Sequence, residues 1–431
     1  MTFSARLLST LAVLICLVLA GCGGSEDQRL SLALGGAPAE IEFWEGLIAD
    51  FQKASGHEVE LIRQPTDSNL RRQGLMTPLK AGQPDPDVFL MDVAWLAQFA
   101  ASGWLSPLDG YLKKTGPDRN AFFKPVVDLA DIHEGKLLAL PINVDGGLLY
   151  YRSDLLKRFG FKGPPRTWNE LVEQALKVQA GMRAEEETFH GFAWQGAQYE
   201  GLICNFLEFA GSNQGGLEIK EDRIRLDTPA NLAALELMHD LIHGLKLSPP
   251  NTFSQMKEEE ARLLFQRGQA LFERNWPYAW ALHQAEDSPV KGKVGLAPLP
   301  SFAGGESVST LGGWHVGLSR HSLDKDRAWE LIRFMVSAQT QKKLALHLGW
   351  NPGRRDVYSD PEVLAAMPHL SNLREVFDQA RPRPVKPYYS RLSEVLQRRL
   401  NAALAGQLSP AEALAKAQEE AQAVIDRYKE G

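Results

Sequence analysis

Apolar and polar residues follow one another along most of the chain in two kinds of pattern. Between residues 43 and 51, apolar side chains recur every three or four positions, which predicts a helix that ends at Gly56. Residues 88–91 (VFLM) are instead apolar throughout, and Asp92 follows them directly. Such a run is typical of a strand buried on both faces, as in a parallel sheet that helices cover.

Further segments of both kinds follow along the chain. Strands are predicted at 59–61, 137–140, 148–151, 270–272 and 294–297. Helices are predicted from Asn69, from the N-cap residue Ser153 through Phe159, and after the N-cap residues Thr167, Thr228 and Ser409. Glu170 and Glu412 lie three residues after two of these N-caps, which is capping-box spacing. Strands and helices that alternate over this length predict an α/β protein with two lobes.

Three segments rich in proline and glycine interrupt the alternation. They are 141–147 (PINVDGG), 297–305 (APLPSFAGG) and 348–356 (LGWNPGRRD). A chain bends readily at such residues but does not continue a sheet through them. We therefore expect crossings between two discontinuous lobes that share a hinge. The predicted division assigns residues 30–141 and 298–346 to lobe 1, and residues 142–297 and 347–431 to lobe 2.

The first residues have a different character from the rest of the chain. Arg6 precedes the apolar run 7–20, and small residues then lead to Cys22 in the sequence LAGC. This pattern predicts a lipoprotein signal peptide over 1–21, lipidation of Cys22 and a polar tether over 22–29. The alternative is an ordinary secretory signal in which Cys22 is incidental. Both interpretations predict an exported protein.

Composition narrows the possible partners. The formal net charge is −6 at pH 7, and there is no run of Lys and Arg, so no nucleic-acid partner is expected. No cofactor is expected either, because the chain is exported and lacks the phosphate-binding patterns G-x-x-x-x-G-K-[ST] and G-x-G-x-x-G. With Cys16 removed and Cys22 acylated, Cys204 has no partner for a disulfide, so a large core must stabilise the fold.

Carboxylates and tryptophans follow several predicted strands. Asp92 follows the run 88–91, Asp145 lies in the first crossing, Trp276 comes soon after the strand 270–272, and Trp314 opens a strand in LGGWHVGL. Open α/β sheets bind ligands beyond the carboxyl ends of their strands. The alternatives are that Asp92 caps a helix near residue 94, that Asp145 makes a turn, and that the indoles are core.

A third aromatic cluster, RPRPVKPYY, contributes Arg383, Tyr388 and Tyr389. Indole faces with carboxylates and a guanidinium suit a carbohydrate, whose C–H face stacks on an aromatic ring and whose hydroxyls bond to charged groups. Two carboxylates around a sugar also describe a glycosidase, so a lipoprotein glycoside hydrolase using Asp92 and Asp145 is the alternative function. A structural or adhesion lipoprotein is a third possibility.

Other candidate sites are weaker. His239 and His243 are spaced i, i+4 but lack the Glu of H-E-x-x-H, and their place at a helix C-terminus explains them. The tyrosine pairs 150–151 and 388–389 could bind a hard metal through phenolates, but nearby tryptophans favour a neutral ligand. Cys204, within the apolar stretch LICNFLEF, is expected in the core. No metal site is therefore predicted.

Four stretches carry a family resemblance: 192–215 (FAWQGAQYEGLICNFLEFAGSNQG), 274–280 (RNWPYAW), 311–319 (LGGWHVGLS) and 348–358 (LGWNPGRRDVY). Through them the chain resembles the extracellular solute-binding proteins, family 1, of ABC sugar importers, most closely the trehalose/maltose-binding group. The resemblance implies a two-lobed periplasmic-binding-protein fold of type II, like that of maltose-binding protein. It also implies a disaccharide in the cleft between discontinuous lobes that close about a hinge.

The resemblance further implies which residues bind the ligand. They are Glu40, Thr66, Asp92, Asp145, Trp276, Gly313, Trp314, Arg383 and Tyr389. Glu42 is an alternative to Glu40. Where the resemblance to this group implies an aromatic residue two positions before the crossing aspartate, this chain has Asn143, so one stacking surface is missing or replaced by a hydrogen bond.

The expected function is therefore a sugar-binding lipoprotein of an ABC transporter, and not an enzyme. It would be a monomer in the periplasm or on the cell surface, and it would contact the membrane only through the lipid on Cys22. Its partners would be a disaccharide such as trehalose or maltose and the transmembrane subunits of a permease.

Overall fold

A computed structural model of the chain describes residues 29–367, 370 and 380–430. The predicted signal peptide, Cys22 and all but the last residue of the predicted tether lie outside the described residues. Within the described ranges, no helix combines the length and the apolar character that crossing a bilayer requires.

The first lobe is built on a five-stranded sheet with the order β2-β1-β3-β15-β6. Its strands are β1 (Leu30–Gly35), β2 (Val59–Gln64), β3 (Val88–Asp92), β6 (Ala139–Pro141) and β15 (Trp314–Leu318). Strands β2 and β3 lie parallel to β1, whereas β15 enters antiparallel between β3 and β6. This register sets Trp314 opposite Asp92 at the end of β3.

Helices cover both faces of this sheet. They are α2 (Pro38–Ser55), α3 (Ser68–Lys80), α4 (Leu96–Ala101), α5 (Asp109–Thr115), α14 (Lys325–Met335) and α15 (Ala338–Leu348). In β3, Val88 and Leu90 pack with Trp44 of α2, while Phe89 and Met91 pack on the opposite face with α3 and α4. The run 88–91 is thus a strand buried on both faces, as its apolar pattern predicted.

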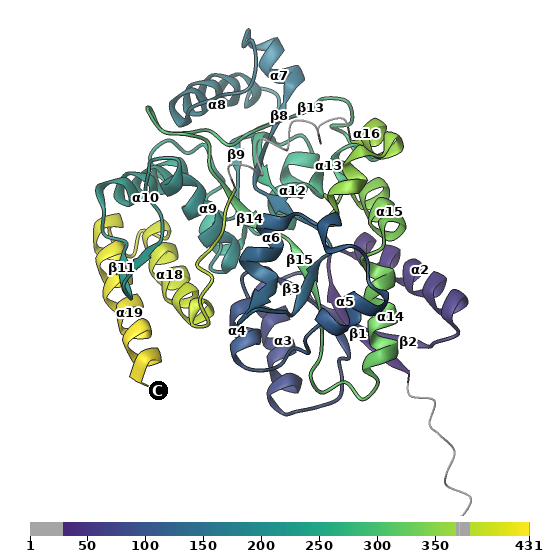
Figure 1. The fold of residues 1–431 in the computed structure, drawn as a ribbon. Coiled ribbons are helices and arrows are strands. Elements are labelled where there is room, and N and C mark those ends of the chain that lie inside the picture. The colour runs from purple at the N-terminus through teal and green to yellow at the C-terminus, as the bar shows by residue number, and fades with distance from the viewer. Residues whose placement is uncertain (1–28, 368–369, 371–379, 431) are drawn as a thin grey trace, which may run out of the picture.

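The second lobe has a four-stranded sheet with the order β13-β8-β12-β9. Its strands are β8 (Leu148–Arg152), β9 (His190–Ala193), β12 (Ala270–Asn275) and β13 (Val294–Ala297). The helices around it are α8 (Trp168–Met182), α9 (Glu200–Gly211), α10 (Pro229–Ile242), α12 (Glu258–Gln266), α18 (Tyr389–Leu404) and α19 (Pro410–Glu430). Helices α10, α18 and α19 pack together away from the first sheet (Figure 1), and they share a core with α8 and α9.

The remaining elements are short. They are η1 (Arg119–Ala121), α6 (Lys124–Val126), η2 (Val127–Asp131), β4 (Ile132–His133), β5 (Lys136–Leu137), α7 (Ser153–Arg158), β10 (Glu218–Lys220), β11 (Arg223–Arg225), α11 (Thr252–Gln255), α13 (Ala279–His283), η3 (Arg355–Ser359) and α16 (Pro361–Ala366).

A small sheet connects the two lobes. It has the order β16-β14-β7, formed by β7 (Asp145–Gly146), β14 (Ser309–Gly312) and β16 (Ala380–Arg381). The antiparallel pairing of β14 with β7 sets Gly312 opposite Asp145, and the chain then passes through Gly313 into β15 of the first sheet. The two segments that cross between the lobes are therefore hydrogen-bonded to each other.

Packing differs from the predicted lobe boundaries by a few residues. Leu299 and Phe302 pack in the core of the second lobe, because the chain after β13 stays on that lobe and Ser301 N donates to Arg166 O at 3.0 Å. Leu348 and Trp350 pack in the core of the first lobe. We propose that the second crossing lies at β14.

The predicted helix caps are confirmed at three of four positions. Thr167, Thr228 and Ser409 each accept a hydrogen bond from a backbone N–H of the helix that follows. The prediction for Ser153 is wrong, because the N-cap position of α7 is Arg152. The Ser153 hydroxyl instead donates to Lys293 O, just before β13, at 2.9 Å. It is therefore not used to cap the helix.

These caps predict a stability difference between two conservative substitutions. Thr167→Ala removes a capping box and is expected to lower the free energy of unfolding by about 1 kcal/mol. Ser153→Ala removes an exposed hydroxyl that caps no helix, so the free energy of unfolding should fall by less than about 0.5 kcal/mol. Urea unfolding of both variants measures the difference, and equal losses would contradict the capping argument.

Candidate ligand-binding cleft

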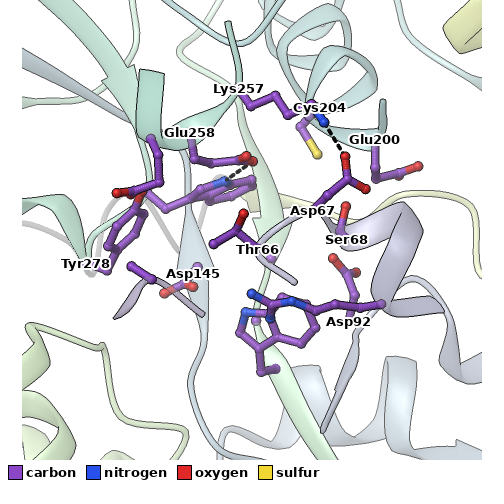
Figure 2. A pocket seen from close by; sticks show the side chains of 18 of the residues that line it. Thr66, Asp67, Ser68, Asp92, Asp145, Glu200, Cys204, Lys257, Glu258 and Tyr278 are labelled. Carbon is purple, nitrogen blue, oxygen red and sulfur yellow. Dashed lines mark hydrogen bonds and ion pairs between the residues drawn. The ribbon is translucent and has the colours of Figure 1, made fainter. Parts of the chain in front are cut away.

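A cleft with a volume of about 530 Å³ lies between the two lobes. Eight of the nine predicted ligand residues line it: Glu40, Thr66, Asp92, Asp145, Trp276, Gly313, Trp314 and Arg383. Figure 2 shows Thr66, Asp92 and Asp145 gathered around one space, with Glu258 and Tyr278 on the side of the second lobe. Residues that are distant in the sequence therefore form a single site.

The ninth residue, Tyr389, does not line the cleft. It is 1% exposed at the start of α18, and its hydroxyl donates to Glu200 Oε1 at 2.6 Å. Glu200, the first residue of α9, does line the cleft. The structure thus places Tyr389 behind the cleft, where it supports a lining carboxylate, because α18 packs against α9.

The Trp314 side chain is fixed on several sides within the first lobe. The Arg71 guanidinium lies 4.4 Å from the centroid of its ring, and the Trp95 ring meets it edge-on at 5.6 Å. Burial lowers the pKa of Arg71 to about 10, which keeps the group cationic at neutral pH. Nothing in the sequence pattern around Arg71 distinguished it, because its role depends on a strand more than two hundred residues away.

Asp92 both stabilises a turn and lines the cleft. Its Oδ1 accepts from Ala94 N at 2.8 Å, in the turn before α4 rather than at the N-cap of that helix, which is Trp95, and its carboxylate also lines the cleft. Arg383 donates to Asp92 Oδ1 at 2.7 Å and to Glu200 Oε1 at 3.1 Å. Since Asp92 belongs to the first lobe and Glu200 to the second, Arg383 joins the two sides of the cleft.

Asp145 is held by Asn143, the residue at whose position the resemblance implies an aromatic side chain. Asn143 Nδ2 donates to Asp145 Oδ2 at 2.6 Å, and Asn143 Oδ1 accepts from Trp314 N at 2.9 Å. Burial, with the Glu40 and Asp92 carboxylates nearby, raises the pKa of Asp145 from 3.8 to about 7. Near neutral pH, this carboxyl group is therefore present in both its acid and its carboxylate form.

The backbone conformation and the close packing at residue 313 require glycine. Its φ of +134° is strained for a residue with a side chain, and a Cβ there would lie 2.4 Å from Asn143 O. Its carbonyl accepts from Val93 N at 3.1 Å. The glycine is required where the two crossings come closest, next to Trp314.

Glu40 lines the cleft with both oxygens already bonded. Oε2 accepts from Ala37 N at 2.6 Å and Oε1 from Trp350 Nε1 at 2.7 Å. Burial raises the pKa of this carboxyl group. The alternative residue Glu42 is exposed and is not part of the lining.

Trp276 lies at the carboxyl end of β12, as the sequence predicted. Its N–H donates to Asn275 Oδ1 at 2.8 Å, and its carbonyl accepts from the Tyr150 hydroxyl at 2.8 Å. The indole Nε1 donates to Glu258 Oε1 at 3.4 Å, and Figure 2 marks this bond. A hydrogen-bonded strand end thus presents the indole to the cleft.

Sequence reasoning missed several lining residues. They are Arg71, Glu200 and the charged start of α12, residues 257–260. Cys204 also lines the cleft, although it was expected only in the core (Figure 2). It is 2% exposed, and burial raises the pKa of its thiol, so it stays protonated and is no nucleophile.

The weaker candidates have structural roles. The rings of His239 and His243 lie 4.5 Å apart, and His243 Nε2 contacts Leu404 O at 2.7 Å. The Tyr150 hydroxyl is bonded to the backbone of Trp276. Among the described residues, no three His, Cys, Asp or Glu side chains are grouped so as to hold a metal ion.

Comparison with known proteins agrees with this architecture. Residues 37–342 match the family model described as bacterial extracellular solute-binding protein. The chain belongs to this family. It is 37% identical over 346 residues to a probable ABC transporter-binding protein of Deinococcus radiodurans, a match that covers 80% of each chain.

Solved structures place the solute-binding protein among two-lobed relatives. The maltose-bound MalE3 protein of T. maritima has a TM-score of 0.87 and 39% identity, covering 91% of this chain and 99% of that one. A solute-binding protein of Thermotoga lettingae bound to α-D-tagatose has a TM-score of 0.83 and 27% identity, covering 92% and 100%. The fold is therefore that of the maltose-binding-protein-like periplasmic binding proteins, and members of this family are binding components of transporters rather than enzymes.

The pKa of Asp145 predicts part of the pH dependence of stability. Because its folded pKa of about 7 lies above 3.8, its contribution is full below pH 3.8 and is lost as the pH rises through 7. Asp145→Asn should therefore make the urea unfolding midpoint less dependent on pH between about pH 4 and 7.

The matched control is Asp50→Asn. Asp50 is exposed, and its hydrogen bond to Lys343 lowers its pKa, so its own contribution changes only below pH 3.8. An Asp145→Asn curve parallel to that of the wild type between pH 4 and 7 would show that the Asp145 carboxyl ionises normally in the cleft.

Proposed function

We propose that this solute-binding protein captures a disaccharide of the maltose or trehalose type between its lobes. The observation that carries the proposal is the sharing of one cavity by indole and carboxylate groups from both lobes. Trp314 and Asp92 come from the first sheet, Trp276 comes from the second, and Asp145 lies in the crossing between them.

The chemistry of this lining suits a polyhydroxylated ligand. An indole presents an apolar face to the C–H side of a pyranose, and carboxylates and Arg383 bond to its hydroxyls. A hydrogen bond to a charged group contributes about 1.5–3 kcal/mol. A few such bonds with one or two stacked rings suffice for micromolar binding, about −8 kcal/mol.

The relatives support a sugar ligand. One structure with 39% identity contains maltose and one with 27% identity contains α-D-tagatose. The preference for a disaccharide rests on the resemblance to the trehalose/maltose-binding group. Because Asn143 uses its side chain to hold Asp145 and Trp314, it replaces a stacking surface with support for two other ligand groups.

Contacts between the lobes favour a mechanism of closure around the ligand. Lys257 pairs with Asp67 across the cleft, and Arg72 Nη2 of α3 lies 2.5 Å from Glu394 Oε1 of α18. A sugar that touches both sides only when they are close biases the protein toward the closed form. A shift from 1:99 to 99:1 requires about 5.5 kcal/mol of differential affinity. The closed, loaded protein would then dock on the permease.

The remaining parts of the proposal concern location. Cys22 at the end of the signal segment would carry a lipid that anchors a monomeric protein in the periplasm or at the cell surface. Delivery of sugar to permease subunits would then occur next to the membrane.

Calorimetry with maltose, trehalose and sucrose tests the proposed function. At least one sugar should bind, and Trp276→Ala should weaken binding by about tenfold or more, because it removes an aromatic surface from the cleft. Trp104→Ala is the matched control, since Trp104 is a partly buried tryptophan outside the lining.

Two outcomes would contradict the proposal. If Trp276→Ala bound every sugar as tightly as the wild type does, the cleft would not be the binding site. If purified protein released glucose from maltose or trehalose, the glycoside hydrolase that uses Asp92 and Asp145 would become the better description.

A further inference from the structure

The ring of Trp276 rests on a buried cation. Arg274, two residues earlier in β12, places its guanidinium carbon 4.0 Å from the centroid of the indole ring. The Arg274 side chain is 1% exposed. At the ring edge there is little room for movement, since a Cβ on Gly312 would lie 3.0 Å from Trp276 Cζ3. One face of the indole is thus occupied by the protein itself.

The position of Arg274 is in turn determined by Glu208 of α9. Its Nε and Nη2 donate to Glu208 Oε2 and Oε1 at 2.7 and 2.5 Å, a two-point contact that fixes the plane of the guanidinium. Both side chains are 1% exposed. Gly147 makes room for them, because a Cβ there would lie 2.1 Å from Glu208 Oε1.

This ion pair also touches the connection between the lobes. Glu208 Oε1 accepts from Thr310 N of β14 at 3.1 Å, and the Thr310 hydroxyl donates to Cys204 O at 3.0 Å. Strand β14 pairs with β7, which contains Asp145. The carboxylate that orients Arg274 is therefore bonded to the same strand that leads to Gly313 and Trp314.

We propose that Arg274, oriented by Glu208, is a positioning residue that holds the Trp276 indole at the angle needed for sugar stacking. The proposal rests on the proposed function only in identifying the ligand as a sugar. A buried ion pair contributes little net stability compared with apolar residues of the same volume. We therefore attribute the presence of this pair beneath a cleft residue to orientation, since a planar guanidinium stacks face to face with an aromatic ring.

The test replaces both charges together, because removing one alone would leave the other buried and unpaired. Arg274→Met with Glu208→Gln keeps similar side-chain volumes, and the glutamine can still accept from Thr310 N. In the full chain, this pair of substitutions should weaken binding of the best sugar about tenfold. In a Trp276→Ala background the same pair should change the dissociation constant less than about twofold, since no ring is left to position.

The matched control is Arg152→Met with Asp154→Asn. Arg152 is another largely buried arginine with a two-point carboxylate contact, at 2.8 and 2.6 Å, and it lies in the same sheet but outside the cleft lining. If orientation of Trp276 is the cause, these control substitutions should leave the sugar dissociation constant unchanged within about twofold. Equal losses of affinity with and without Trp276, or an unchanged dissociation constant with only a lower Tm, would overturn the proposal.

A second readout needs no ligand. Subtracting the emission spectrum of Trp276→Phe from that of the intact protein isolates the fluorescence of Trp276. The same subtraction is made in the Arg274→Met, Glu208→Gln background, with and without Trp276→Phe. The spectrum of Trp276 obtained there should differ from that in the intact protein, because the contact at 4.0 Å is lost. An unchanged spectrum would overturn the positioning role even if no sugar bound, whereas wild-type protein that binds no sugar would overturn only the proposed function.

Discussion

The pairing of β14 with β7 and of β15 with β3 is the arrangement on which the cleft depends. It sets Gly312 opposite Asp145 and, two residues later, Trp314 opposite Asp92. Strand side chains alternate between faces, so a slip of one residue would turn these groups away from the cavity. Asn143 secures this register, because its side chain bonds both to the backbone of Trp314 and to the Asp145 carboxyl group.

Charge pairing shapes the rest of the site. An unpaired charge that is removed from water is costly, so the acidic groups around this cleft are held by fixed donors. Arg383 lies between Asp92 and Glu200, and Arg274 is paired with Glu208. Two arginines also stack on tryptophans that line the cleft, Arg71 on Trp314 and Arg274 on Trp276. Groups oriented in this way before binding lose less freedom when a ligand arrives.

The contacts between the lobes bear on how a two-lobed binding protein would hold its ligand. Each sheet has its own core. The lobes meet through the crossings, through polar pairs such as Lys257 with Asp67, and through an apolar cluster in which Ala345 of α15 packs with Leu148 of β8. Polar pairs at a partly exposed interface are weak and reversible. Under the proposed closure mechanism, a ligand that contacts both sides would shift the balance between the open and closed forms.

The sequence by itself determined the local features: the doubly buried strand at 88–91, the caps at Thr167 and Thr228, and an indole at the end of β12. These follow from short-range periodicity and hydrogen bonding, which a linear pattern records. The family resemblance indicated nine ligand residues. Eight of them line the cleft, and Tyr389 lies behind the lining. Only the tertiary structure decided that Tyr389 bonds Glu200, that Ser153 bonds Lys293, and that Arg71 and Arg274 stack on tryptophans. In most of these pairs the two residues are more than a hundred positions apart in the sequence. The orientation of their side chains is set by tertiary packing, which no local sequence pattern records.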